Sequence, residues 1–71
     1  MVIMAAENEG SRIVRKLIAL DVSVWRIAKE CGVSYQTGKA WRRGWWNPDM
    51  GNTYKLMAFL HKIEHTQKYG F

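Results

Sequence analysis

Two short helix-forming segments, each preceded by a serine and followed by a glycine, lie side by side in residues 23–44. A serine before a helix accepts a hydrogen bond from a free backbone N–H of the first turn, and glycine ends a helix because it enters the left-handed conformation without steric penalty. Ser23 and Gly32 bracket the first segment, and Ser34 and Gly44 bracket the second. The stretch therefore predicts two helices joined by a short turn, which is a helix-turn-helix unit.

The first of these helices has one apolar row. Ile27 and Cys31 are four residues apart and share a helical face, with Val24 and Ala28 beside them. We expect this row to pack inward, with Cys31 as a small buried hydrophobe rather than a reactive thiol. A single cysteine also excludes an internal disulfide and a cysteine-rich zinc site.

The second helix is expected from about residue 35 to residue 43 and has two unlike faces. Thr37, Gly38 and Trp41 lie on one side at spacings of three and four. The other side has no acidic residue and consists of Tyr35, Gln36, Lys39, Arg42 and Arg43. A solvated charged surface is one interpretation of this side. Contact with nucleic acid is the one favoured here, because recognition helices present polar groups near their N-terminus to base edges.

The pattern around this turn fixes small, turn and aromatic residues at set intervals. Its members are Ala28, four residues before Gly32; Gly32-Val33-Ser34; Trp41-Arg42-Arg43-Gly44; and Asn47-Pro48. On these residues the chain resembles the helix-turn-helix DNA-binding domain of the lambda-repressor and Cro (XRE-like) type over residues 12–64. One departure is Gly38, where the family places valine or isoleucine. We expect Trp41 or Trp45 to fill the gap that this glycine leaves.

The resemblance implies a small bacterial or phage transcriptional regulator, such as a Cro-like repressor, that binds double-stranded DNA as a homodimer. The second motif helix would enter the major groove. Expected base contacts are Ser34, Tyr35, Gln36, Lys39 and Arg42; expected phosphate contacts are Ser23, Arg26 and Arg43; expected packing residues are Ala28, Gly32 and Trp41. Two alternatives stay open: a DNA-recognition subunit of a phage packaging or recombination complex, and an antirepressor-like module that binds protein.

Charge and composition agree with a polyanion partner. The 71 residues carry a formal net charge of +5, and residues 22–48 hold five cations but a single acid, Glu30. We find no catalytic constellation, so an enzyme, a cofactor and a small-molecule substrate are not expected. His61 and His65 have a spacing that suits metal, but a third ligand is not evident and we expect no metal site.

The remaining sequence predicts two further helices and an all-α, compact bundle of four or five short helices in one domain, residues 1–71. Ser11 is expected to cap a helix that ends near Leu20. The last helix is expected from Asp49 or Asn52 to near His65. Flexible ends are expected at residues 1–10 and 66–71.

The apolar residues after the second motif helix leave two questions open. Leu56, Leu60 and Ile63 form a row on the last helix, within a stripe broad enough either to be all core or to add a dimer surface. Of Trp45 and Trp46 we expect one in the core and one at the surface. The sequence has no signal peptide and no membrane-length apolar run, so no membrane partner and a cytoplasmic, nucleoid-associated location are expected.

Overall fold

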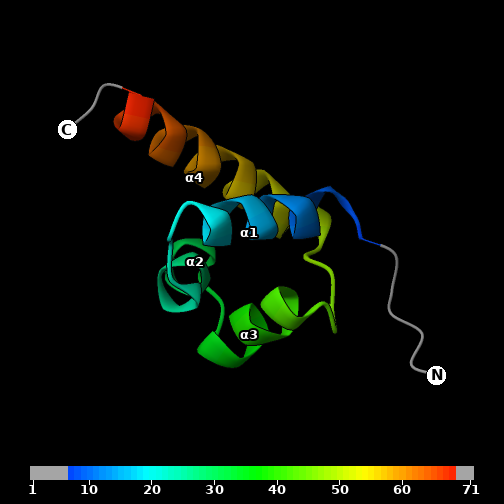
Figure 1. Cartoon of the computed structure of the whole chain (residues 1–71). Helices are drawn as coiled ribbons and strands as arrows, with labels where there is room; N and C mark the ends of the chain where they lie inside the picture. The colour runs from blue at the N-terminus through cyan, green and yellow to red at the C-terminus, as the bar shows by residue number, and fades with distance from the viewer. Residues whose placement is uncertain (1–6, 69–71) are drawn as a thin grey trace.

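The computed structural model describes residues 7–68, which form helices and connecting segments without a strand. The helices are α1 (Glu9–Ala19), α2 (Val24–Cys31), α3 (Tyr35–Arg43) and α4 (Met50–Lys68). The pair α1 and α4 packs together, α2 lies against both α3 and α4, and α3 contacts α1 and α2 but not α4 (Figure 1). The predicted all-α bundle is confirmed for this part of the chain, with four helices.

The local signals of residues 23–44 are found where the sequence places them. The hydroxyl oxygens of Ser23 and Ser34 each accept a hydrogen bond, at 3.2 Å, from the backbone N–H three residues further on. Gly32 and Gly44 adopt φ values of 69° and 80°, in the left-handed region. The ends of α2 and α3 are therefore set by local hydrogen bonds and by glycine.

The start of α1 differs from the prediction. Asn8, not Ser11, caps the helix: its Oδ1 accepts a hydrogen bond from the Ser11 backbone N–H at 2.9 Å, and its amide donates to the Pro48 carbonyl at 2.8 Å. Ser11 is buried, and its hydroxyl donates to Asn47 Oδ1 at 2.5 Å. The prediction of a Ser11 cap was wrong because this serine joins α1 to the loop before α4, a contact that no local pattern reveals.

Gly10 lies where α1 meets that loop and α4. A Cβ atom built on Gly10 would lie 2.5 Å from Thr53 Oγ1 and 2.8 Å from Pro48 Cβ, closer than real Cβ contacts allow. The proline ring is rigid and cannot move aside as a flexible side chain can. The absent side chain at Gly10 therefore permits the close approach of α1 and the Pro48 loop.

We expect Gly10→Ala to lower the free energy of unfolding by about 1 kcal/mol, because overpacking outweighs the better helix propensity of alanine. Gly51→Ala is the matched control in the first turn of α4, since a Cβ there would meet its nearest atom, Asp49 Oδ1, at an ordinary 3.7 Å. Urea unfolding followed by circular dichroism measures both variants. A Gly10→Ala variant as stable as the parent would contradict the close packing.

The core lies where α1, α2 and α4 meet, with one side chain contributed by α3. Leu17 and Leu56 are fully buried at its centre, and burial of the predicted row Leu56, Leu60 and Ile63 confirms the inward face of α4. The cluster consists of Ile13, Val14, Leu17, Val22, Ile27, Cys31, Trp41, Leu56, Phe59, Leu60 and Ile63. Burial raises the pKa of the Cys31 thiol, which keeps it protonated, as expected for a packed hydrophobe.

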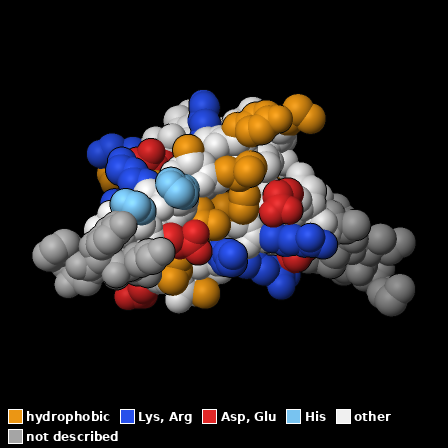
Figure 2. Space-filling view, turned by 90° about the horizontal axis from the view of Figure 1, so that it is seen from above, with side chains coloured by type: hydrophobic (Ala, Val, Ile, Leu, Met, Phe, Trp, Pro, Cys, Tyr) orange, Lys and Arg blue, Asp and Glu red, His pale blue; other side chains and the backbone are white. Residues whose placement is uncertain are grey.

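The longest helix, α4, begins after Asp49, whose Oδ1 accepts a hydrogen bond from the Asn52 backbone N–H at 2.8 Å. It continues past His65, and α1 and α4 both extend into segments for which flexible ends were expected. Met50, Tyr54 and Met57 are exposed on its outer side, and Figure 2 shows hydrophobic side chains on this face beside the two histidines. None of the helices that the structure describes is long and apolar enough to span a membrane.

Candidate nucleic-acid interface

The outer face of α3 is open to solvent. Four of its five predicted residues are exposed and Lys39 is half-buried; the exposed ones are Tyr35, Gln36, Arg42 and Arg43. At about 100° per residue, these five positions cover a continuous arc of about 120° of the helix. This exposure shows that no other described helix covers the arc, and α3 makes no contact with α4 (Figure 1).

The inner face of α3 explains why the arc points outward. Gly38 and Trp41 are buried, as the motif predicts, and Ala28 of α2 is buried opposite them. A Cβ atom built on Gly38 would lie 3.1 Å from the Ala28 Cβ and 3.2 Å from the Val24 Cγ1. The expectation of a gap beside Gly38 was therefore wrong. The two helices approach closely enough to use the space that a larger side chain would take.

The two tryptophans after α3 also differ from the prediction. Trp45 and Trp46 are both 60% exposed, so neither fills the core or the space beside Gly38. After the left-handed turn at Gly44, the Trp45 N–H donates to the Ala40 carbonyl at 3.0 Å, which closes the C-terminal end of α3. The Arg43 guanidinium lies 5.1 Å from the Trp45 ring centroid, so a cation and an aromatic ring meet at the end of α3.

Three cations on or near α3, namely Lys29, Lys39 and Arg43, lie over aromatic rings rather than beside acids. Lys39 Nζ is 5.7 Å from the Tyr35 ring centroid, and Lys29 Nζ is 5.1 Å from that of Trp25. Within residues 7–68 the salt bridge found joins Arg15 to Glu7, and none involves a cation of α3. The positive charge of this face is therefore not neutralised by ion pairs within the described protein, which leaves it available to an anionic partner.

The phosphate contacts expected from the sequence do not all lie on this face. Ser23 lines an open surface pocket together with Tyr35 and Arg42, so it borders the face. Arg26 lies on another side of α2, where its guanidinium is 5.4 Å from the ring centroid of Phe59 in α4. The structure thus brings Ser23 together with the residues of α3 and places Arg26 apart from them.

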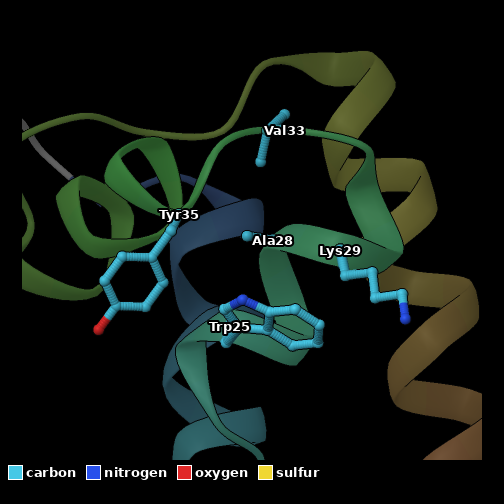
Figure 3. Close-up of a pocket in the computed structure, with 5 residues that line it drawn as sticks. All are labelled: Trp25, Ala28, Lys29, Val33 and Tyr35. Atoms are coloured by element: carbon cyan, nitrogen blue, oxygen red, sulfur yellow. The ribbon is translucent and has the colours of Figure 1, made fainter.

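Sequence reasoning missed one residue of the face. Trp25 is 59% exposed and, with Tyr35, lines a pocket between α2 and α3 (Figure 3). The signal was present, because α2 and α3 both place a lysine four residues after an aromatic residue, Trp25 to Lys29 and Tyr35 to Lys39. Two such pairs on adjacent helices indicate a mixed aromatic and cationic surface.

No metal site accompanies this surface in the part of the chain that the structure describes. No group of three or more His, Cys, Asp or Glu residues there is arranged to hold a metal ion. The rings of His61 and His65 stack on α4 with centroids 5.9 Å apart. Comparison of the chain with models of protein families, with curated proteins and with solved structures found no match.

Proposed function

We propose that this chain is a sequence-specific DNA-binding protein of the helix-turn-helix type, acting as a small transcriptional regulator. The observation that carries the proposal is the outward arc of α3, which is cationic, free of acidic residues and not covered by another described helix. An α-helix with its side chains is about 10–12 Å across, which fits a major groove about 12 Å wide. In the proposal α3 enters that groove.

The side chains of the arc suit the groove's chemistry. The amide of Gln36 can pair with adenine through two hydrogen bonds, and the cations of Lys39 or Arg42 can donate to guanine O6 and N7. Ser34 and Tyr35 lie at the N-terminal end of α3, where polar groups reach base edges or phosphates. All five residues lie on or beside the same solvent-facing arc.

The flanking residues would fix the position of α3 on the phosphates. Ser23 borders the face, and Arg43 stands at the end of α3 over Trp45. We leave Arg26 out of the contact set because its guanidinium lies over Phe59, towards α4. A single α3 reads one half-site, so the proposal includes a homodimer on an inverted repeat, acting as a repressor through occupancy of the DNA.

A protein-binding module is the second candidate, favoured by the exposure of Trp45 and Trp46. Large exposed aromatic side chains are enriched in protein interfaces. A gel shift at physiological salt against random duplexes separates the two: a shift supports DNA binding, and none at micromolar protein supports a protein partner. Light scattering then separates a dimeric regulator from a subunit of a packaging or recombination complex, which would form a ring or a hetero-assembly.

We expect Arg43→Ala to weaken binding to every duplex by a similar factor and to reduce the slope of log K against log salt by about 0.9, because the variant neutralises one phosphate fewer. Fluorescence anisotropy of a labelled mixed-sequence duplex over a series of salt concentrations measures both quantities. Lys62→Ala removes an exposed cation of α4, a helix that makes no contact with α3, and should leave the slope unchanged. Equal slopes for the Arg43 variant and the parent would remove Arg43 from the interface.

A further inference from the structure

An open pocket of about 410 Å³ lies between α2 and α3 beside the proposed recognition helix (Figure 3). Its lining consists of Trp25, Ala28, Lys29, Val33 and Tyr35. Two exposed aromatic rings and one lysine thus surround two aliphatic side chains, and no acidic residue lines the pocket. A ligand that suits it has an apolar, compact part and a negative charge.

The cations are held against the aromatic rings. Lys29 Nζ lies 5.1 Å from the Trp25 ring centroid, and Lys39 Nζ lies 5.7 Å from that of Tyr35. An anion that pairs with either ammonium group therefore comes to lie beside a ring, and the group attached to that anion meets the ring's surface. The arrangement favours a ligand in which an anionic group and an apolar ring are neighbours.

We infer that this pocket receives the sugar–phosphate backbone of one DNA strand, with a phosphate at Lys29 and a deoxyribose against Trp25 and Tyr35. The inference rests on the proposed function, because the pocket lies at the N-terminal end of α3, where the edge of a major groove would pass. Each nucleotide supplies the required neighbours, an anionic phosphate and a compact furanose ring.

The residues on the other side of Trp25 indicate where the phosphate of the strand would lie. There a second open pocket is lined by Ser23, which is proposed above to contact a phosphate, and also by Asp21, whose carboxylate makes this side less favourable to a phosphate than the Lys29 side. The phosphate that lies directly beside Trp25 is therefore expected on the Lys29 side, and the Ser23 hydroxyl would meet a different phosphate of the backbone. Because the contact is to the DNA backbone, it raises the affinity for every sequence equally and contributes no sequence preference.

The test is the anisotropy titration of a labelled mixed-sequence duplex at several salt concentrations. We expect Trp25→Ala to raise Kd about fivefold at every salt concentration with an unchanged slope, because an apolar contact releases no counterion. Trp25→Phe keeps a ring and should retain most of the affinity. Lys29→Ala should instead lower the slope by about 0.9. Tyr54→Ala removes a similarly exposed ring on α4 and should bind as the parent does.

Several results would overturn the inference. If the parent binds the duplex and Trp25→Ala binds equally well, the pocket assignment fails while the proposed function stands. A loss confined to one sequence would make Trp25 a base contact, and tighter binding of a single strand than of the duplex would make the pocket a base-stacking site. If the parent binds no duplex, both proposals fail. Because Trp25 is exposed, circular dichroism of the variants should match that of the parent.

Discussion

Replacing Gly38 with valine is expected to lower the free energy of unfolding by about 2 kcal/mol, because the new side chain would overpack the contact between α2 and α3. A Cβ at this position lies 3.1 Å from the Ala28 Cβ, 3.2 Å from the Val24 Cγ1 and 3.4 Å from the Val24 carbonyl oxygen, before the two valine methyl groups are added. The helix-turn-helix resemblance proposed from the sequence would place valine or isoleucine at this position, so the expectation is specific to this chain. Urea unfolding measures the change.

A double-mutant cycle assigns the effect to the helix contact. Ala28→Gly removes the facing methyl group and costs about 1 kcal/mol alone through helix propensity. In the Gly38→Val background it should cost less, with a favourable coupling of about 1 kcal/mol, because the relieved clash offsets that cost. A Gly38→Val protein as stable as the parent would show that α2 and α3 lie further apart and accommodate the usual family residue.

Replacing Gln36 with alanine is expected to weaken binding to the preferred DNA site by about 1–3 kcal/mol, roughly 5- to 150-fold, and to relax the preference at one base position. The reason is that Gln36 is exposed on the arc of α3 and its amide can form two hydrogen bonds with one base. Binding-site selection followed by competition titrations measures the affinity and the preference together.

The Arg43→Ala protein is the contrasting control for Gln36, because a side chain that binds only phosphate supports every sequence equally, and its removal weakens them all alike. Since Gln36 is exposed, its removal should leave the unfolding midpoint unchanged. A Gln36→Ala protein with an unaltered base preference would show that another face of the molecule meets the bases.

The parts of the fold that the sequence predicts well are those that depend on neighbouring residues. Ser23 and Ser34 bond to backbone groups three residues away, and Gly32 and Gly44 need only their own left-handed conformation. These interactions depend only on residues close in sequence and not on how the rest of the chain folds. The bounds of α2 and α3 therefore followed from the pattern.

The errors concern contacts between distant segments. Ser11 looked like a cap, but its hydroxyl bonds to Asn47, which lies 36 positions away. A gap was expected beside Gly38, but α2 approaches α3 so closely that the space is filled. The exposure of Trp45 and Trp46 likewise depends on the path of the chain after α3. Such packing choices are set by the whole fold and not by any one segment.

In the candidate interface, too, local spacing predicted the exposure of some residues correctly and could not place others. Helical spacing placed Gln36, Arg42 and Arg43 on one exposed face, and the structure agrees with that exposure, while their role in binding stays a prediction. Spacing alone did not distinguish Arg26, which lies over Phe59, from the residues that border α3. Trp25 was missed because the exposure of a tryptophan on an amphipathic helix is decided by which neighbours cover it.

Selection of binding sites from a pool of random duplex DNA tests the central claim most directly, because it reports whether a preferred sequence exists, which bases form it and how they are arranged. If α3 reads bases in the major groove of a homodimer, the selected duplexes should share two copies of one short sequence in inverted orientation, about one helical turn apart or a multiple of it. If folded protein enriches no sequence over the starting pool, α3 is not a recognition helix.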